Sequence, residues 1–518
     1  MATRKLTGEP YKLLGHRLAF TNWLFVRPGS FNWVNERGEG AIVFGNEGPL
    51  DARFVPPTDP FGVRLVHHKA QRMGPIIDAQ MPWEIGGASI GTIIEEDNRY
   101  RAWGALGWGD LADRGKHYFC YWESDDGLAW RRPSLGIVEE NGSRDNNLLS
   151  LKGGTVFIDP IAPAAERYKW VNIERVSAVA YENWRARWPQ ETDPRCERNV
   201  GGTIYYGVTG AVSPDGLRWK KLDEPIGMMH ADTQPICYYD VHLEKYVLYV
   251  RDWMVPPLSS HIDRYDENQW LRTARRAIGR TESNDFRHFP LSQIVLEPPT
   301  WLDGNAVLYT NCYTTIPHAP EQHLMFPAVW DAASDSTAIY LATSSDGRVW
   351  ELSPGEPLLE TNEFGQFDGG AIFAAPNLIE LLNGDWALPY TGYNVPHKYP
   401  RRQATRAVGY AVWPKGRLMG IESQERGGFS TIAVIPPAQR LTINASTKRS
   451  GEILVQAEDL QLRPIAGRTF DDAIPMFADL PRTPVRWKEH DDLGISPGEA
   501  VVLRFKLRQA TVYALDFK

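Results

Sequence analysis

The sequence has few cysteines and no long apolar run. Its four cysteines, Cys120, Cys196, Cys237 and Cys312, are widely spaced in 518 residues and match neither a metal-ligand pattern nor a disulfide framework. No run approaches the roughly 18 apolar residues that a membrane span needs. Residues 1–8 lack the apolar stretch of a signal peptide, so we expect a cytoplasmic protein.

A surplus of positive charge is also missing. The net charge of −8 argues against nucleic acid or an anionic membrane as the main partner. The sequence contains no Walker loop, no dinucleotide fingerprint and no His-Glu-x-x-His motif. Stretches with helical periodicity are scarce, whereas 19 Trp and 21 Tyr are present. These aromatic residues suit either the core of an all-β protein or stacking on sugar rings.

One phrase recurs along the chain: Ser, any residue, Asp, Gly, two residues, Trp. Full copies occupy residues 124–130, 213–219 and 344–350, and a degraded copy at 283–289 has Phe in place of both Gly and Trp. Each full copy follows a short apolar run, and Asp-Gly after such a run is a turn signal. We interpret each copy as the outer hairpin of one sheet. A recurring strand–turn–strand unit is typical of a β-propeller.

The spacing of the copies bears on the number of blades. The copies begin at residues 124, 213, 283 and 344, farther apart than the roughly 40–50 residues of a plain four-stranded blade. We therefore expect inserted loops and a five-bladed β-propeller over residues 1–430, which would carry any catalytic site. After residue 430 apolar and polar residues alternate, which predicts an antiparallel C-terminal β-sandwich over residues 431–518. The predicted fold class is all-β.

Several stretches resemble bacterial proteins similar to glycoside hydrolase families 32 and 43. These stretches are residues 124–136, 141–147, 157–160, 211–216, 232–234, 249–253, 276–280, 324–327 and 502–513. The resemblance covers nearly the whole chain and implies a five-bladed propeller with a C-terminal β-sandwich and glycosidase activity. Such relatives often carry an acidic residue in the first strand, where this chain has Thr21 and Asn22. Another acid then takes that role, or the chemistry differs, or the protein is not a hydrolase.

Carboxylates are the expected catalytic groups, because glycoside cleavage uses two carboxyls that flank the scissile bond. In a propeller, acids far apart in sequence meet at the mouth of the channel. The catalytic candidates are Asp232, Asp159, Asp368, Glu174 and Glu84. Asp232 is the strongest, since it lies in a loop just before a strand, and Glu174 or Glu84 would donate the proton. Each acid can instead serve a turn or an ion pair.

The candidates for substrate binding are Arg251, Gln234, His397, His230, Asp252, Trp83, Trp253 and Trp301. The arginine suits a substrate hydroxyl or carboxylate and suits a structural ion pair equally well. The histidines are either ligand contacts or ordinary structural residues. The three tryptophans are either platforms for sugar rings or parts of the core.

The favoured hypothesis is a glycoside hydrolase-like enzyme that cleaves a glycosidic bond in a small glycoside or oligosaccharide. One alternative is a non-catalytic carbohydrate-binding propeller, and another is a lyase or transglycosidase on the same scaffold. We expect a small carbohydrate as partner, neither nucleic acid nor membrane, and the sequence leaves a homo-oligomer open. No cofactor is expected; a calcium ion in the channel would suit the scaffold, although no motif indicates one.

Overall fold

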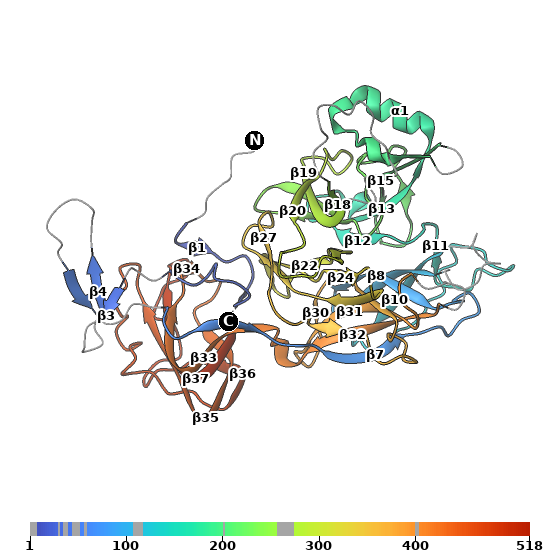
Figure 1. Ribbon diagram of the computed structural model, residues 1–518. Coiled ribbons are helices and arrows are strands. Elements are labelled where there is room, and N and C mark those ends of the chain that lie inside the picture. Colours follow the sequence, from blue (N-terminus) through green and yellow to red (C-terminus); the bar gives the residue numbers. More distant parts are fainter. Residues whose placement is uncertain are drawn as a thin grey trace. The chain divides into compact units, whose positions relative to one another are not determined.

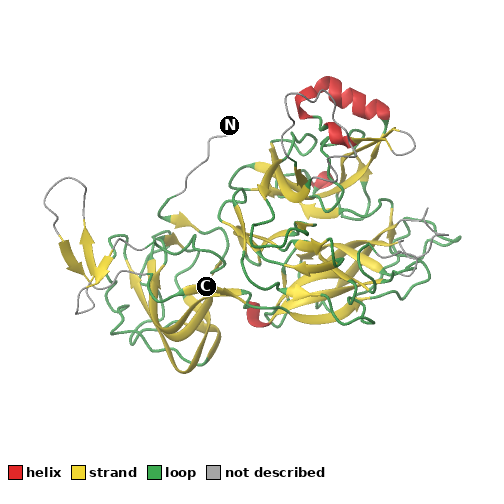
Figure 2. Cartoon of the chain, viewed as in Figure 1, coloured by secondary structure: helices red, strands yellow, loops and turns green. Residues whose placement is uncertain are grey.

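The computed structural model describes residues 8–28, 32–34, 40–43, 52–55, 60–106, 118–199, 203–255, 274–398 and 404–518. These residues are nearly all β-structure, as Figure 2 shows. Within them α1 (Ala178–Arg187) is the only α-helix, and short 3-10 turns lie at Ala164–Glu166, Pro189–Glu191, Pro194–Cys196 and Pro414–Gly416. The described residues form two compact units. The first unit falls in residues 1–68, 315–322 and 413–518, and the second unit falls in residues 69–314 and 323–412.

The second unit is built from antiparallel sheets (Figure 1). One sheet has the order β11 (Leu148–Leu149), β10 (Tyr118–Ser124), β9 (Arg99–Leu106), β8 (Ala88–Glu96). The next has the order β12 (Thr155–Ile158), β13 (Tyr168–Val176), β15 (Thr203–Ser213), β14 (Glu197–Asn199), with β16 (Lys220–Lys221) also on β15. A third has the order β17 (Ile236–Asp240), β18 (Lys245–Met254), β19 (Arg275–Ser283), β20 (Gln293–Leu296).

The remaining strands of this part follow the same antiparallel pattern. Two sheets alternate along the chain, in the orders β21 (Ala306–Leu308), β24 (Ala328–Asp331), β25 (Ser336–Ile339), β28 (Leu359–Glu360) and β22 (Tyr313–Ile316), β23 (Ala319–Met325), β26 (Ala342–Ser344), β27 (Trp350–Leu352). The last sheet has the order β29 (Ala371–Ala374), β31 (Trp386–Tyr393), β32 (Arg406–Trp413), β7 (Gln71–Ile77), with β30 (Ile379–Glu380) also on β31.

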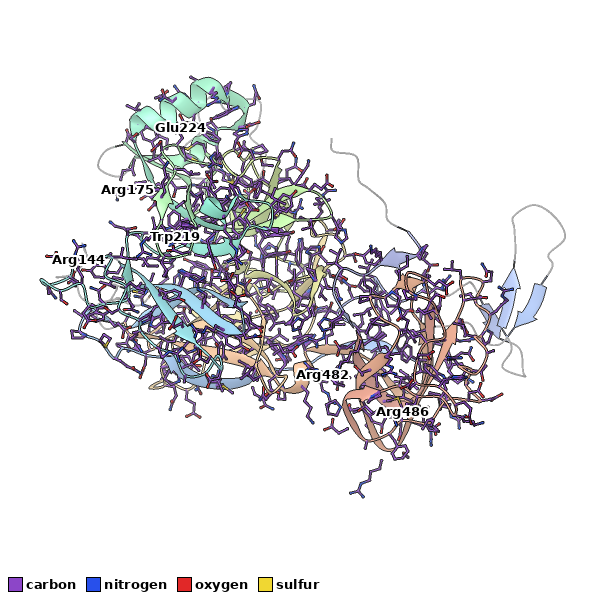
Figure 3. The ribbon with its side chains drawn as sticks, turned by 180° about the vertical axis from the view of Figure 1, so that it is seen from behind. Arg144, Arg175, Trp219, Glu224, Arg482 and Arg486 are labelled. Carbon is purple, nitrogen blue, oxygen red and sulfur yellow. The ribbon has the colours of Figure 1, made fainter. Side chains whose placement is uncertain are left out.

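The repeated phrase forms the turn that follows β10, β15 and β26 in its three full copies. In the second copy, Ser213 Oγ accepts the backbone N–H of Gly216 at 3.0 Å, and Asp215 Oδ1 accepts those of Leu217 and Arg218 at 2.9 and 2.8 Å. Gly216 has φ of +74°, a conformation that glycine adopts without strain. Trp219, labelled in Figure 3, follows directly and packs against a core of the unit. The predicted strand–turn–strand hairpin is therefore present at this copy, where β15 pairs with β16 across the turn.

Each turn also binds a strand of another sheet. The carbonyl of Gly127 accepts the Tyr410 hydroxyl at 2.9 Å, that of Gly216 accepts the Trp103 indole N–H at 2.7 Å, and that of Gly347 accepts the Tyr249 hydroxyl at 2.5 Å. These donors lie on β32, β9 and β18 respectively. In the degraded copy, Phe286 packs against Phe157 at 5.9 Å between ring centroids. In each full copy the turn has the same shape and presents the glycine carbonyl to a donor on another sheet. This shared role explains why the motif recurs in the sequence.

The first unit centres on a sheet whose strands come from both ends of the chain. Its order is β36 (Asp479–Pro484), β35 (Leu441–Glu458), β37 (Val502–Phe517), β33 (Met419–Ser430), β6 (Arg64–His67), with β2 (Arg17–Ala19) also on β37. Two smaller sheets pair β1 (Tyr11–Lys12) with β34 (Val434–Ile435), and β3 (Asn32–Val34) and β5 (Ala52–Val55) with β4 (Gly40–Val43). A buried apolar core that includes Phe429, Trp487 and Phe505 lies against the main sheet.

The four cysteines form no disulfide framework, as the sequence predicts. All four cysteines are free and buried. Burial raises the pKa of the Cys120, Cys237 and Cys312 thiols, so they behave as small apolar residues. Among the described residues, no helix is both long and apolar enough to cross a bilayer.

The first copy of the turn gives a prediction about acid stability. Asp126 Oδ1 accepts the N–H groups of Leu128 and Ala129, both at 2.8 Å, and these bonds lower the pKa of the carboxyl. Its contribution is therefore present above the unfolded pKa, near about 4, and is lost as the pH falls through the lower folded value. We expect Asp126→Ala to cost about 1–2 kcal/mol of unfolding free energy at pH 7.

Urea unfolding of both proteins at pH 7 and below about pH 4 measures this effect. The difference in unfolding free energy between wild type and Asp126→Ala should become smaller in acid. The control is Asp125→Ala, which removes the neighbouring exposed carboxylate and its ion pair with Arg131 and should have a smaller effect. A gap that widens in acid would refute this role for Asp126.

Candidate functional site

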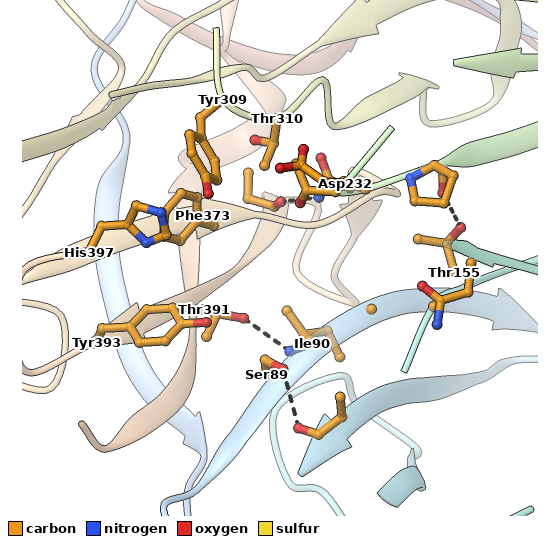
Figure 4. A pocket seen from close by; sticks show the side chains of 18 residues that line it. Ser89, Ile90, Thr155, Asp232, Tyr309, Thr310, Phe373, Thr391, Tyr393 and His397 are labelled. Atoms are coloured by element: carbon orange, nitrogen blue, oxygen red, sulfur yellow. Dashed lines mark hydrogen bonds between the residues drawn. The ribbon is translucent and has the colours of Figure 1, made fainter. Parts of the chain in front are cut away.

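The second unit contains a pocket of about 340 Å³ at the ends of strands from several sheets (Figure 4). It is lined by Ser89, Ile90, Gly91, Ala105, Gly154, Thr155, Asn172, Asp232, Thr233, Gln234, Pro235, Tyr309, Thr310, Phe373, Ala374, Thr391, Tyr393 and His397. Most of the polar groups are hydroxyls and amides, and three of the side chains are phenyl or phenol rings. A pocket of this size and polarity suits a small polyhydroxylated ligand.

Hydrogen bonds between sheets hold the walls of the pocket. The backbone N–H of Ile90 on β8 donates to the Thr391 hydroxyl on β31 at 3.0 Å. The Thr155 hydroxyl at the start of β12 donates to the carbonyl of Pro235 at 2.5 Å. Because these residues lie within strands or directly beside them, the rim has the rigidity of the sheets behind it.

Asp232 is the only carboxylate among the described residues that line the pocket. Its Oδ1 accepts a hydrogen bond from Nη1 of Arg251. Arg251, on β18, is almost fully buried, with 1% of its side chain exposed, whereas 37% of the Asp232 side chain is exposed. The buried partner thus fixes a carboxylate whose other side opens to the pocket.

Arg251 is held in place by Tyr309. Its Nε donates to the Tyr309 carbonyl at 3.1 Å, Nη2 donates to the same oxygen, and the guanidinium lies 4.0 Å from the centre of the Tyr309 ring. An arginine with these contacts has little freedom to leave Asp232 for a substrate. The substrate-binding role of Arg251 stays a prediction; in the structure its guanidinium contacts Asp232 and Tyr309.

Gln234, a predicted substrate-binding residue, lines the pocket. Both polar atoms of its side-chain amide form hydrogen bonds within the protein. Its Nε2 donates to the Ala374 carbonyl at 2.6 Å, and its Oε1 accepts the backbone N–H of Cys312 at 2.8 Å. Its carbonyl accepts the Asn311 amide at 2.8 Å. The residue has φ of +42°, an uncommon conformation outside glycine that a functional loop often contains. Gln234 ties three strand ends together and presents Asp232.

His397 and three rings form one side of the pocket, opposite the Thr155 side in Figure 4. The His397 ring lies 4.6 Å from the Tyr309 ring and 5.1 Å from the Phe373 ring, both edge to face. Tyr393 packs edge to face on Phe373 at 5.8 Å. This side offers apolar ring surface beside a titratable imidazole, which suits the faces and hydroxyls of a sugar.

Asp159 does not line the pocket. It is 2% exposed and lies at the far end of β12 from Thr155, where it accepts the Tyr246 hydroxyl at 2.7 Å and pairs with Lys169 at 3.5 Å. Burial and the bond to Asp159 raise the pKa of Tyr246. Its partners give Asp159 a structural role in joining β12, β13 and β18.

Asp368 is likewise outside the pocket lining. Its side chain is fully buried, and its Oδ2 accepts Arg72 Nε at 2.6 Å and the Tyr390 hydroxyl at 2.7 Å. Burial, and then the bond to Asp368, raise the pKa of Tyr390. These contacts join β7 and β31 to the loop before β29.

The two predicted proton donors are also in ion pairs outside the pocket lining. Glu84 has no exposed side chain, pairs with Arg132 at 2.8 Å, and accepts the backbone N–H groups of Gln80 and Met81 at 2.8 and 3.0 Å. Glu174 pairs with Lys221 and accepts the Thr209 hydroxyl at 2.9 Å. The partner of Glu174 is therefore Lys221 from β16 rather than its neighbour Arg175.

The other predicted binding residues are not among those that line the pocket. His230 is buried, with its ring centre 6.0 Å from that of Trp253. Asp252 accepts the Ser292 hydroxyl at 2.7 Å, and burial raises the pKa of its carboxyl. Trp83 donates its indole N–H to Asn147 at 2.9 Å. Trp301 is 41% exposed, 6.0 Å from Tyr340. None of the three predicted tryptophans is among the residues that line the pocket.

Sequence reasoning missed the hydroxyls and phenols of the pocket. Asn172, Tyr309, Thr310, Thr391 and Tyr393 all line it, and none of them was predicted. Threonines at strand ends are common in any all-β protein, so they carry no signal alone. The order Tyr309-Thr310-Asn311 before a strand, matching Asp232-Thr233-Gln234 before β17, is the one pattern in the sequence that points to them.

A second pocket lies beside α1, where Glu224, labelled in Figure 3, is one of the lining residues. Two tryptophans line it: the Trp188 ring stacks on His288 at 4.3 Å with the Arg187 guanidinium at 4.2 Å, and Trp184 is buried. Within the described ranges no group of three or more His, Cys, Asp or Glu side chains is arranged to hold a metal ion.

Comparisons with known proteins find distant structural similarity only. No protein-family model matches the chain. No curated protein matches its sequence. Among solved structures, a protein described as a glycoside hydrolase is similar with a TM-score of 0.41 and 13% identity, over 67% of this chain and 91% of that one.

Two further solved structures are similar to the chain. The glycoside hydrolase family 32 β-fructofuranosidase of Bombyx mori has a TM-score of 0.36 and 9% identity, over 86% of this chain and 95% of that one. An N-acetylgalactosamine deacetylase from F. plautii has a TM-score of 0.39 and 14% identity, over 67% of this chain and 95% of that one. Because these similarities are low, the function is argued from the pocket.

Proposed function

We propose that this chain is a glycoside-active enzyme, a hydrolase that cleaves a glycosidic bond in a small glycoside or oligosaccharide. The observation that carries the proposal is Asp232, a carboxylate fixed by Arg251 and exposed to a pocket of hydroxyls, amides and aromatic rings. Such a lining matches a neutral sugar, whose hydroxyls need donors and acceptors and whose ring faces need apolar surface.

We further propose that the sheets of the second unit are the blades of a closed five-bladed propeller. Hydrogen bonds join neighbouring inner strands in turn: Val156 N–H to Thr92, Thr155 to Pro235, and Asn311 to Gln234. Leu378 N–H to Thr314 and Ile90 N–H to Thr391 continue the series back to β8. The two sheets that contain β22 and β21 would then form one bent blade. In the first unit, the main sheet and its core support the β-sandwich of families 32 and 43.

The geometry suits Asp232 as the base in this reaction. A neighbouring guanidinium favours the ionised form of a carboxylate, and an ionised carboxylate accepts a proton. Asp232 takes one proton from water as the water oxygen attacks the anomeric carbon and the bond to the leaving oxygen breaks. The leaving oxygen takes a proton, and His397 is the lining residue that can supply one near neutral pH.

A substrate panel tests the proposal. We expect wild type to cleave at least one compound among furanosides, pyranosides and oligosaccharides and to release a reducing sugar. Reducing-end detection and chromatography measure the products. Products with an unsaturated, ultraviolet-absorbing ring would instead indicate a lyase. No product from any compound, by a folded protein, would contradict the hydrolase proposal.

One observation favours a carbohydrate-binding protein as the second candidate. Glycoside hydrolysis commonly uses two carboxyls, and a single carboxylate lines this pocket among the described residues. A binding protein would retain sugar affinity without turnover. Its affinity would also change little in Asp232→Asn, since an amide keeps the hydrogen-bonding capacity of the side chain.

A further inference from the structure

Arg276, on β19, has a side chain for which the described residues supply no hydrogen-bond acceptor. Its neighbour across the sheet is Trp253, and the described part of the chain supplies no ion pair or hydrogen bond to its guanidinium. Its Nε is fully shielded from solvent and unpartnered. A guanidinium carries five N–H donors, and leaving buried donors unsatisfied is costly. The site therefore lacks an acceptor that a ligand or water must provide.

Aromatic rings hold Arg276 in this position. Its guanidinium lies 4.6 Å from the ring centre of Trp253 and 5.3 Å from those of Tyr309 and Trp330. Ring faces stabilise a cation but accept no strong hydrogen bond, so they do not satisfy the shielded Nε–H. Tyr309 lines the pocket, whereas Arg276 is not itself a lining residue; its contact with the Tyr309 ring places it beside the part of the wall that Tyr309 forms.

Other charged side chains lie around the same rings. Arg251 pairs with Asp232, and the Lys398 ammonium lies 5.3 Å from the Trp330 ring. Asp335 accepts the Trp330 indole N–H at 2.8 Å and the backbone N–H of Lys398 at 2.7 Å. Among these described side chains, both Asp232 and Asp335 therefore already have partners of their own.

The surroundings of Arg276 disfavour its positive charge. Burial lowers the pKa of its guanidinium, the nearby charge of Arg251 lowers it further, and Asp232 raises it. An arginine nevertheless stays protonated at neutral pH. A half-buried cation that its surroundings destabilise gains from an added anion.

We propose that the pocket contains an oxyanion subsite at Arg276, so that the enzyme takes a sugar together with a negatively charged oxygen group. The planar fork of arginine matches phosphate, sulfate and carboxylate oxygens. The group is either a substituent on the sugar or free inorganic phosphate, and both share this chemistry. The expectation of a sugar in the pocket rests on the proposed function. The expectation of an anion at Arg276 does not.

Calorimetric titration with inorganic phosphate at constant ionic strength tests the subsite without any turnover. We expect wild type to bind phosphate and Arg276→Gln to bind it roughly 10-fold more weakly or worse, because charge-assisted hydrogen bonds are lost. Arg276→Lys keeps the charge without the fork and should fall between them; it also carries the test if Arg276→Gln fails to fold. The matched control is Arg287→Gln, which removes the same charge from an exposed ion pair with Glu166 and should bind as wild type does.

The source of the anion follows from turnover with neutral sugars, with and without phosphate, and with phosphorylated, sulfated and carboxylated sugars. Turnover confined to charged sugars supports a substituent, and turnover of neutral sugars only with phosphate present supports free phosphate. No phosphate binding by folded wild type would overturn the subsite, as would equal binding by wild type and Arg276→Gln. Failure of the hydrolase proposal alone would leave phosphate binding intact.

Discussion

Replacing Asp232 by asparagine is expected to lower kcat by roughly 10³-fold, within the range that a positioned acid or base contributes. The substitution keeps the size of the side chain and an oxygen that can accept from Arg251, so the protein should stay folded. It removes the ability to take up a proton at this atom. The measurement is steady-state kinetics on a substrate found in the panel, with KM expected to change less than kcat.

The matched control for Asp232→Asn is Glu174→Gln. Both remove one carboxylate that pairs with a basic side chain, but Glu174 pairs with Lys221 and lies outside the pocket lining. We expect the control to keep kcat within about 2-fold of wild type, well below the effect of losing a base. Equal losses in the two variants would mean that charge, rather than position in the pocket, matters.

Breaking the buried pair of Glu84 and Arg132 should have the largest effect on stability. Glu84→Gln leaves Arg132 without a charge partner at a site where 8% of its side chain is exposed, and the expected cost is about 3 kcal/mol of unfolding free energy. Urea or thermal unfolding measures the loss. The activity of the remaining folded enzyme should match that of wild type, because Glu84 does not line the pocket.

The control for this prediction is Glu182→Gln in α1. Glu182 pairs with Arg185 at 3.0 Å, but about half of each side chain is exposed, so the expected cost is below about 1 kcal/mol. A Glu84→Gln variant as stable as this control would show that the buried pair does not hold the loop before β8. A stable but inactive Glu84→Gln variant would return Glu84 to the catalytic candidates.

The repeated turns could be predicted because their chemistry is local. Ser124, Asp126 and Gly127 bond one another and the next two residues, so the phrase dictates its own shape wherever it occurs. The Asp232 loop was found for a related reason. An acid followed by Thr-Gln just before a strand marks a strand end, and the structure places Asp232 and Gln234 at the pocket.

The other acids could not be sorted from sequence, since their partners lie far along the chain. Arg72 is 296 residues from Asp368, and Tyr246 is 87 residues from Asp159. A strand-end acid beside Pro or Gly looks the same whether it faces a pocket or a buried base. The same limit hid Tyr309, whose carbonyl and ring hold Arg251 from another sheet.

The most direct measurement is a crystal structure of Asp232→Asn with an uncleaved substrate from the panel. The account predicts the sugar in the pocket of Figure 4, its scissile bond beside residue 232, and a water or sugar oxygen within about 2.6–3.2 Å of that side chain. It also predicts ring contact with the side formed by Phe373, Tyr393 and His397. A sugar bound elsewhere on the protein, with this pocket empty, would contradict it.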